Sequence, residues 1–265
     1  MDSTISAAAP TRMRRKLIDN LKRVEQRIAD ACSRASRDPQ TVTLIAVTKS
    51  ATLDIIRTMV DIGLSDLGEN RPQELSRRAA AIQEALSRRS RDGAAPGLPR
   101  WHLIGHLQRN KVKGVLPYID VIHSVDSLRL AEEIDAQSAK LDRRTPILLE
   151  VNAADEPQKH GVAVAATTHL AEQIHSLKNI ELRGLMAMAP MTEDTSRVRA
   201  IFGRVRELFD EVIGERFAGP EFKELSMGMS SDFETAIEFG ATLVRIGSAL
   251  FEGIELAPQQ PAETD

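Results

Sequence analysis

Short apolar runs alternate with amphipathic segments along most of the chain, from about residue 43 to about residue 251. Eight of the runs are rich in Val, Ile and Leu, which is typical of strands that are buried on both faces. In the segments between them apolar residues recur at three- and four-residue steps, which predicts helices, for instance over 72–89 and 197–216. The predicted strands cover residues 43–49, 64–70, 101–106, 120–126, 146–152, 180–190, 222–229 and 243–251.

A regular order of strand, helix, strand, helix predicts parallel strands joined by helical crossovers. Eight such strands fit a closed barrel better than an open sheet, so the expected fold class is α/β, a (β/α)8 TIM-type barrel. An apolar stripe before the first strand predicts an extra N-terminal helix, and its members are Met13, Leu17, Leu21, Val24, Ile28 and Ala31. We expect a disordered tail over 1–12, one barrel domain over 13–255 and a C-terminal tail over 256–265, with 87–100 as an insertion loop.

Composition narrows the class of protein. Of the 265 residues, 42% are hydrophobic and 28% are charged, which is ordinary for a globular protein with a sizeable core. The net charge of −3 argues against a nucleic-acid partner, because binding phosphates needs an excess of positive charge. No apolar run approaches the length that crosses a bilayer, the N-terminus lacks the order of a secretion signal, and Cys32 has no second cysteine to pair with. We therefore expect a cytoplasmic protein with no membrane and no nucleic-acid partner.

Polar residues gather where the predicted strands end. In barrels of this type the chemistry takes place at the carboxyl ends of the strands. A single His or Asn at a strand end is commonly a turn residue, but so many around one mouth favour a binding or catalytic site. In chain order these residues are Lys49, Asn70, His106, His123, Ser124, Asn152, Met188, Ser230, Arg245, Gly247 and Ser248.

The last two predicted strands are followed by Gly/Ser turns of a kind that binds phosphate. Loops after strands seven and eight of such barrels frequently offer backbone N–H groups and a helix N-terminus to a phosphate. In "GMSSDFETA", Ser231 has the spacing of a capping-box residue, which leaves the hydroxyl of Ser230 for an anion. In "IGSALFEG", Gly247 lets the backbone approach a ligand closely and Ser248 adds a further donor.

Two basic residues face the same predicted mouth. Arg245 lies within an apolar strand, two residues before Gly247 and so on the same face. Because a guanidinium keeps its charge, it needs a partner there, either a buried acid or a bound ligand. Lys49 continues the alternation of Ile45 and Val47, so we expect it to point inward as well. Partial desolvation and a nearby cation would favour its neutral amine, the nucleophile that forms a Schiff base with an aldehyde.

These features match the three contacts that pyridoxal 5′-phosphate requires. A Schiff-base lysine suits its aldehyde, an anion cradle suits its phosphate, and a strand-borne arginine suits its ring nitrogen. A Schiff-base aldolase that acts on a sugar phosphate would use the same lysine and cradle without a cofactor, so it stays an alternative.

The motifs also resemble those of the pyridoxal phosphate homeostasis protein family, over about residues 13–253. They are, in the expected order, "IAVTKS", "GENRPQE", "WHLIGHLQRNK", "HSVD", "EVN…KHGV", "GLMAMAP", "LSMGMSSDFETAI" and "VRIGSALF". The resemblance implies the barrel of the N-terminal domain of alanine racemase, with Lys49 joined to the cofactor as a Schiff base. It also implies roles for five more residues: Ser230, Gly247 and Ser248 hold the phosphate, Arg245 faces the pyridine nitrogen and Asn70 lies beside the cofactor.

The resemblance further implies a monomer that binds, buffers or delivers the cofactor, with transient contact to apo-enzymes, rather than an enzyme. Racemisation on this fold needs a second acid or base on the face of the cofactor opposite the lysine. The single tyrosine, Tyr118, lies away from the strand ends, so no catalytic residue is predicted. A pyridoxal-phosphate-dependent amino-acid racemase stays the runner-up, because His106 or a water could serve instead. No metal site is predicted, since His102 and His106 share a strand face but lack a third ligand.

Overall fold

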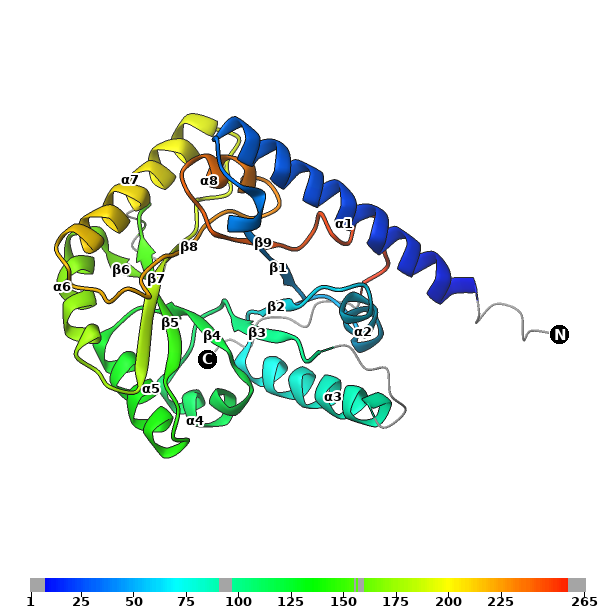
Figure 1. The fold of residues 1–265 in the computed structure, drawn as a ribbon, viewed down its shortest axis with the longest axis horizontal. Coiled ribbons are helices and arrows are strands. Elements are labelled where there is room, and N and C mark those ends of the chain that lie inside the picture. Colours follow the sequence, from blue (N-terminus) through cyan, green and yellow to red (C-terminus); the bar gives the residue numbers. More distant parts are fainter. Residues whose placement is uncertain (1–7, 91–96, 155, 157–159, 257–265) are drawn as a thin grey trace.

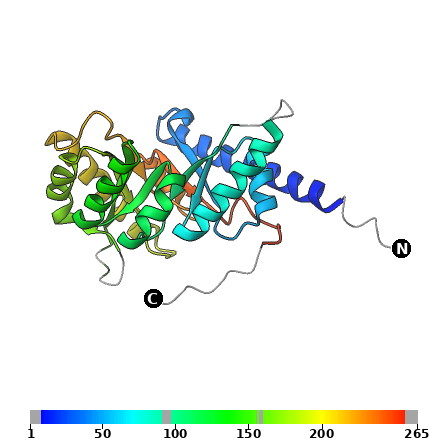
Figure 2. The same ribbon diagram turned by 90° about the horizontal axis from the view of Figure 1, so that it is seen from below.

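The structure, a computed structural model, describes residues 8–90, 97–154, 156 and 160–256. Figure 1 shows a ring of strands with helices around its outside, and Figure 2 shows the same arrangement turned by 90°. In both views the N-terminal part of the first helix, α1, extends away from the barrel. No described helix combines the length and the apolar character needed to cross a membrane.

Eight parallel strands form the barrel, as the sequence pattern predicted. Their bounds are β1 Thr43–Val47, β2 Asp66–Glu69, β3 Arg100–Leu103, β4 Val121–Val125, β5 Thr145–Asn152, β7 Ile180–Ala187, β8 Glu224–Ser226 and β9 Leu243–Ile246. They pair in the order β4-β3-β2-β1-β9-β8-β7-β5, and β4 also pairs with β5, which closes the ring. A short strand that the sequence did not predict, β6 Val162–Ala163, pairs with β5. The predicted (β/α)8 barrel is therefore confirmed.

Helices follow the strands at nearly the predicted positions. They are α1 Ala8–Arg34, α2 Leu53–Asp61, α3 Pro72–Ser90, α4 Val112–Val115, α5 Leu128–Lys140, α6 Val164–His175, α7 Thr195–Gly214 and α8 Phe233–Glu238, with the 3-10 turns η1 Pro39–Thr41, η2 Arg109–Lys111 and η3 Leu116–Tyr118. The Asp194 carboxylate starts α7 by accepting from the N–H groups of Ser196 and Arg197. Since α1 begins at Ala8, it includes part of the segment predicted as a tail, while residues 1–7, 91–96 and 257–265 lie outside the described part.

The predicted N-terminal helix ties several parts of the barrel together. Its inner face is the predicted apolar stripe, with Leu17, Val24, Ile28 and Ala31 all buried. The Asn20 amide donates to the backbone carbonyls of Leu250 at 2.9 Å and Glu252 at 3.0 Å, in the turn after β9. Arg27 pairs with Glu234 of α8 at 2.6 Å. Helix α1 therefore supports the loops that follow the last two strands.

Side chains of the strands fill two separate regions. The larger apolar core lies between the strands and the helices. A smaller cluster inside the barrel contains Ile45, Val121, Leu148, Met186 and Leu243. Polar side chains share this interior, because His123 of β4 bonds to Ser226 of β8, and β4 and β8 are not neighbours in the sheet. The near-continuous apolar strands that the sequence pattern predicted thus enclose a partly polar interior.

Gly184 allows β7 to lie against β8. An added Cβ at Gly184 would stand 1.7 Å from the carbonyl oxygen of Glu224. We expect Gly184→Ala to lower the free energy of unfolding by roughly 3 kcal/mol or more, because two backbones must separate to admit the methyl group. Gly214→Ala, at the end of α7 with no atom within 4 Å of the added methyl, should change it by less than about 1 kcal/mol. Urea unfolding of both variants measures this, and similar midpoints would contradict the expectation.

Candidate functional site

The six predicted site residues lie in one sector of the barrel mouth. Lys49 follows β1, Asn70 follows β2, Ser230 follows β8, and the rest, Arg245, Gly247 and Ser248, lie on or directly after β9. These four strands are consecutive neighbours in the order β2-β1-β9-β8. The closed barrel therefore brings together residues that are up to 199 positions apart in the chain.

Lys49 lies at the mouth but is exposed to solvent. The sequence pattern predicted a partly desolvated side chain that continues the inward alternation of Ile45 and Val47. Strand β1 ends at Val47, two residues before Lys49, so the walls of the barrel no longer enclose the side chain. The prediction of partial desolvation was wrong, whereas the position at the carboxyl end of β1 is as expected.

A buried ion pair fixes the backbone next to Lys49. The Thr48 N–H donates to the carbonyl of Gly68 at 2.9 Å, and the Thr48 hydroxyl donates to the Glu69 carboxylate at 2.6 Å. The Arg78 guanidinium donates to that carboxylate and to the carbonyl of Thr48. Because Thr48, Glu69 and Arg78 are all buried, these bonds hold the end of β1 in a single arrangement.

Backbone N–H groups converge on the hydroxyl of Ser230. Gly247 N donates to Ser230 Oγ at 3.2 Å and Ala249 N donates to the same atom at 3.3 Å. This pair of bonds joins the loop after β8 to the turn after β9, and the Ser230 oxygen accepts both of them. Ser231 does not cap the next helix: α8 begins at Phe233 with Asp232 as its N-cap, and the Asp232 carboxylate accepts from Met229 N at 2.6 Å.

Arg245 is buried inside the barrel and bonds to neutral oxygens. Its Nη1 donates to Ser226 Oγ at 2.6 Å, and its Nη2 donates to the carbonyl of Ala187 at 2.9 Å. Burial lowers the pKa of Arg245 to about 10, against the raising effects of Asp232 and Glu150, so the guanidinium stays charged near neutral pH. Among the described residues no carboxylate forms an ion pair with it, so hydroxyl and carbonyl oxygens take the place of the buried acid considered from the sequence.

The structure places His123 and His102 inside the barrel, which the sequence pattern did not suggest. His123 is fully buried between His102 and Ser226 instead of facing the mouth. His102 also bonds to Asp66, at 3.0 Å, so it faces the interior of the barrel. The expectation that His102 and His106 share a face was wrong, because β3 ends at Leu103 and His106 lies on the exposed segment beyond it.

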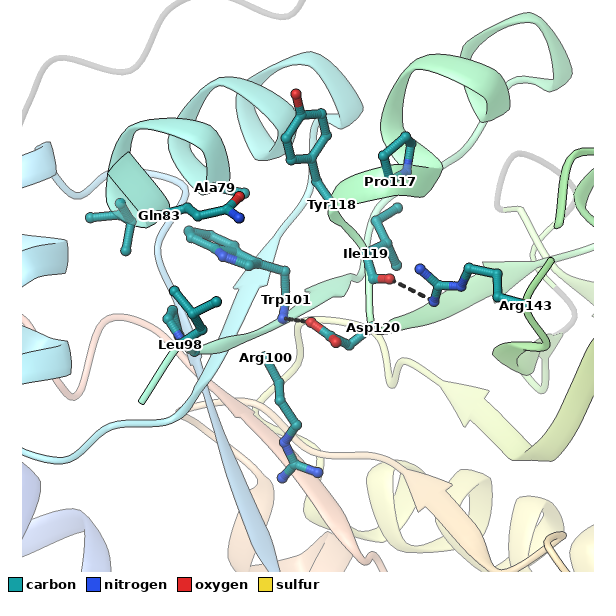
Figure 3. A pocket seen from close by; sticks show the side chains of 12 residues that line it. Ala79, Gln83, Leu98, Arg100, Trp101, Pro117, Tyr118, Ile119, Asp120 and Arg143 are labelled. Atoms are coloured by element: carbon teal, nitrogen blue, oxygen red, sulfur yellow. Dashed lines mark hydrogen bonds between the residues drawn. The ribbon is translucent and has the colours of Figure 1, made fainter. Parts of the chain in front are cut away.

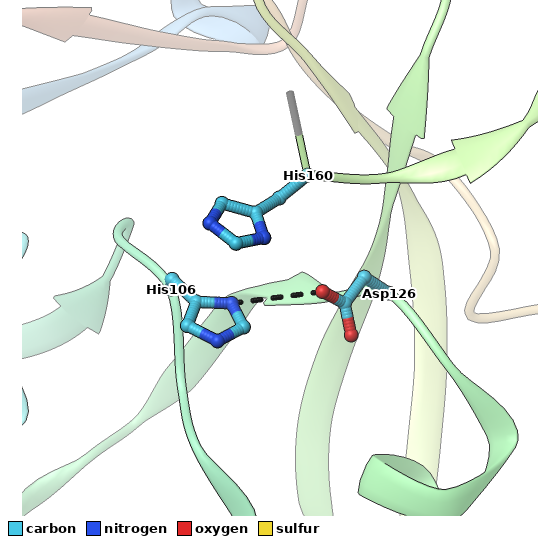
Figure 4. Close-up of side chains that lie close together, drawn as sticks. All are labelled: His106, Asp126 and His160. Carbon is cyan, nitrogen blue, oxygen red and sulfur yellow. Dashed lines mark ion pairs between the residues drawn. The ribbon is translucent and has the colours of Figure 1, made fainter. Parts of the chain in front are cut away.

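A cluster at the mouth contains His106, Asp126 and His160 (Figure 4). His106 Nδ1 lies 3.6 Å from Asp126 Oδ2, and the two imidazole rings stack with centroids 4.0 Å apart and planes 12° apart. Possible ligand atoms of all three lie within 4.8 Å of one another, which the sequence did not reveal. Lone pairs of imidazole lie in the ring plane, so two nearly parallel rings do not direct them at one metal ion. Burial and His160 lower the pKa of His106, opposed by Asp126, which leaves a neutral imidazole beside a carboxylate.

Glu150 is a buried carboxyl that the sequence analysis did not single out. It lies on β5, two residues from Leu148 of the inner cluster and therefore on the inward face, and only 4% of it is exposed. The side chain of Glu150 forms no hydrogen bond or ion pair within the described residues, although its backbone pairs with β7. Burial and the charge of Asp126 raise its pKa to about 7, opposed by Arg245. Its position two residues before Asn152, at the end of a strand, is the signal that could have identified it.

Tyr118 lies at the opposite end of the barrel from the mouth. It belongs to η3, directly before β4, and lines a pocket with Trp101 of β3 and Gln83 of α3 (Figure 3). The expectation that this tyrosine lies away from the strand ends is confirmed.

Comparisons with known proteins point to one family over nearly the whole chain. The family model for the N-terminal domain of alanine racemase matches residues 20–254. The pyridoxal phosphate homeostasis protein of Aquifex aeolicus is 38% identical over 233 residues, which are 88% of this chain and 96% of that protein. The protein of the same name from Pseudomonas aeruginosa is 37% identical over 236 residues, 89% of this chain and 94% of that one.

Solved structures show the same fold. A protein from Bifidobacterium adolescentis has 37% identity and a TM-score of 0.83, covering 94% of this chain and 98% of its own. PipY from Synechococcus elongatus, in a structure with PLP bound, has 34% identity and a TM-score of 0.71, covering 86% of this chain and 99% of its own. An alanine racemase from Clostridium difficile shares the fold alone, with 11% identity, a TM-score of 0.65 and coverage of 89% of this chain and 56% of its own.

The raised pKa of Glu150 predicts a pH-dependent stability. Its folded-state pKa of about 7 lies above the usual value of about 4.3, so ionisation opposes folding. Stability due to this group is fully present below about pH 4 and is lost as the pH rises through 7. Glu150→Gln should therefore raise the free energy of unfolding by roughly 2–3 kcal/mol at pH 8 and change it little at pH 4.5.

Denaturant unfolding of the cofactor-free protein at both pH values measures this difference. Glu25→Gln, at an exposed position of α1, is the matched control and should leave the difference between the two pH values unchanged. An equal effect of Glu150→Gln at both pH values would contradict the expectation.

Proposed function

Because this chain belongs to the pyridoxal phosphate homeostasis protein family, within the group that shares the alanine racemase N-terminal domain, we propose that it binds pyridoxal 5′-phosphate and takes part in the intracellular homeostasis of this cofactor. One observation carries the proposal: an exposed amine, a pair of convergent N–H donors and a buried guanidinium lie on or directly after two neighbouring strands, β1 and β9. PipY, at 34% identity, has PLP bound in its structure, which supports the choice of cofactor.

In this proposal each part of the sector binds one part of the cofactor. Lys49 forms the Schiff base with the aldehyde, and Asn70 lies beside the ring. The phosphate is held by Ser230 together with the turn at Gly247 and Ser248. Two N–H groups already point at the Ser230 hydroxyl, so oxygen acceptors suit this position, and a phosphate oxygen accepts the same kind of bond.

Packing within the protein does not require a glycine at position 247. An added Cβ would meet Val47 at 3.6 Å, which is an ordinary contact. The protein itself would therefore tolerate a methyl group there. A phosphate that approaches the backbone closely gives a reason for glycine at this position.

The proposed role of Arg245 favours a carrier over a catalyst. When bound, the cofactor supplies an aldehyde that condenses reversibly with amines. A guanidinium has five N–H donors and no acceptor, and the bonds to Ser226 and Ala187 use two of them. Arg245 can therefore donate to the ring nitrogen, which must then be unprotonated to accept the bond. An unprotonated ring is a weak acceptor of electrons. We infer that the chain has no substantial catalytic activity.

One feature favours the racemase as the second candidate. The pair of His106 with Asp126, at the mouth, is of the kind that acts as a general acid or base, although its 3.6 Å separation is longer than a hydrogen bond. Incubation with L-alanine or L-serine, followed by chiral chromatography, distinguishes a carrier from a racemase. Formation of the D-amino acid at ordinary enzyme rates would contradict the proposal that the protein is a carrier. A colourless protein that cleaves a phosphorylated sugar would instead favour the aldolase.

We also propose that the protein acts in the cytoplasm as a monomer and transfers the cofactor during transient contact with apo-enzymes. An exposed Lys49 supports this part of the proposal, because an incoming amine must reach the Schiff base to release the cofactor. Size-exclusion chromatography with light scattering tests whether the protein is a monomer in solution.

Replacement of Lys49 tests the covalent attachment. After incubation with the cofactor and reduction with borohydride, we expect the adduct on the peptide that contains Lys49, located by mass spectrometry. Lys49→Ala should remove the adduct and leave the thermal unfolding midpoint unchanged, because an exposed side chain contributes little to packing. Lys113→Ala, an exposed lysine on α4, is the control and should keep the adduct. An adduct that survives in Lys49→Ala would contradict the assignment.

Replacement of Gly247 tests the phosphate contact. Gly247→Ala should leave the stability within about 1 kcal/mol of the parent, because the added methyl group meets no close neighbour. Affinity for pyridoxal 5′-phosphate should fall roughly tenfold, about 1.4 kcal/mol, whereas affinity for pyridoxal, which lacks the phosphate, should change little. Absorbance titration with both compounds measures this. An equal loss of affinity for the two compounds would mean that the phosphate does not bind at Gly247.

A further inference from the structure

A line of hydrogen bonds crosses the barrel interior from β2 to β9. Asp66 Oδ1 lies 3.0 Å from His102 Nε2, and His102 Nδ1 lies 2.9 Å from His123 Nε2. His123 Nδ1 lies 3.0 Å from Ser226 Oγ, which accepts from Arg245 Nη1 at 2.6 Å. All five residues are at most 4% exposed.

The two ends of this line fix the direction of every proton within it. Arg245 can only donate, so the Ser226 oxygen accepts and its single hydroxyl proton passes on to His123 Nδ1. His123 then carries its proton on Nε2 and donates to His102 Nδ1, and His102 donates from Nε2 to the Asp66 carboxylate, which can only accept. Both imidazoles are therefore neutral and protonated on Nε2.

With both rings neutral, the reverse arrangement leaves two acceptors face to face. With His123 protonated on Nδ1, its Nε2 would accept from His102 Nδ1, and the bare His102 Nε2 would face the Asp66 carboxylate at 3.0 Å. The Ser226 proton would also lose its partner among the described residues. Buried, unpaired polar atoms are costly, so this arrangement is disfavoured.

Surrounding charges support the same assignment. Burial raises the pKa of Asp66, but hydrogen bonds from His102, Arg100 and Ser65 outweigh it and bring the pKa to about 2. Burial and the charge of Arg245 hold the pKa of His123 well below its usual range, so it stays neutral. The other charged groups that face the line are Arg100, 2.7 Å from Asp66, and Glu224 near His102 at one end, with Glu150 and Asp232 near Arg245 at the other.

We propose that Asp66, His102, His123 and Ser226 form a proton-ordered relay that positions Arg245, and that through it a carboxylate at the amino-terminal end of the barrel influences the cofactor at the mouth. The inference rests on the proposed function, because it concerns the arginine assigned to the ring nitrogen. Asp66 is the first residue of β2 and Arg245 is the third residue of β9, so the relay crosses the interior from the start of one strand to near the end of the other.

The relay acts as an ion pair whose members are separated by three neutral groups. Each group donates toward Asp66 and accepts from the side of Arg245, so all the dipoles point the same way and strengthen one another. Removing the final acceptor frees the histidines and the Ser226 hydroxyl to reorient. The guanidinium then loses the one arrangement that directs its remaining N–H groups.

The first experiment uses the cofactor-free protein, so it does not depend on the proposed function. In 15N-histidine-labelled protein at pH 7, the nitrogen shifts distinguish a protonated from a bare ring nitrogen. Spectra of His102→Gln and His123→Gln assign the two residues. We expect both histidines to carry the proton on Nε2, and a proton on Nδ1 of either one overturns the relay.

The second experiment measures the effect on the cofactor. Asp66→Ala removes the terminal acceptor, and the matched control is Glu181→Ala, a carboxylate that pairs with Arg183 on β7 but contacts no histidine of the relay. Asp66→Ala should weaken binding of pyridoxal 5′-phosphate roughly threefold or more and shift its absorption maximum. Glu181→Ala should do neither.

Asp66→Asn keeps an acceptor oxygen without the charge, so it should move the affinity and the spectrum in the same direction by less. If Asp66→Ala does not fold, Asp66→Asn decides the outcome. Parent-like affinity and spectrum in the variant that folds, or changes equal to those of Glu181→Ala, overturn the proposal. Failure of the parent protein to bind the cofactor would defeat the proposed function instead, and the histidine tautomers would still test the relay.

Discussion

A guanidinium keeps its proton even when it is buried, so Arg245, on an inward position of β9, must find polar partners inside the barrel. It finds Ser226 on the neighbouring strand and the carbonyl of Ala187 at the end of β7. Ser226 in turn needs an acceptor for its own proton, which leads to His123 and onward to His102 and Asp66. One buried charge thus accounts for the polar half of an interior that would otherwise be filled by apolar layers.

The mouth is held by a second set of contacts on the outer side of the strands. A buried pair, Glu69 with Arg78, fixes Thr48 and so the position from which Lys49 extends. Ser230, in the loop after β8, joins that loop to the turn after β9, and Asn20 of α1 holds the end of that turn. The three parts of the proposed cofactor site are therefore rigid at the backbone, while the reactive amine itself is exposed.

That combination suits a protein that accepts and releases a cofactor. A carrier needs a site that is organised before binding and a covalent link that an incoming amine can reach. Racemisation on the same fold needs in addition a second acid or base on the face of the cofactor opposite the lysine. Here Tyr118 lies at the far end of the barrel, and the group proposed to face the ring nitrogen, Arg245, is an obligate donor. Glu150, with a pKa of about 7, adds a group whose charge at the mouth changes near neutral pH.

The sequence by itself determined the eight strands, the order of strand and helix, the extra helix α1 and the residues at the carboxyl ends of β1, β2, β8 and β9. These follow from periodicity and from position relative to a strand end, which are properties of neighbours along the chain. Tertiary structure alone decided that Lys49 is exposed, that Asp232 rather than Ser231 occupies the N-cap position of α8, and that His106 meets Asp126 and His160. It also decided that Arg245 bonds to a hydroxyl instead of an acid and that Asp66, His102 and His123 continue that bond across the barrel. The reason is that periodicity shows which face of a strand a residue occupies, whereas its partner depends on which strands stand opposite one another once β4 pairs with β5 and the sheet closes.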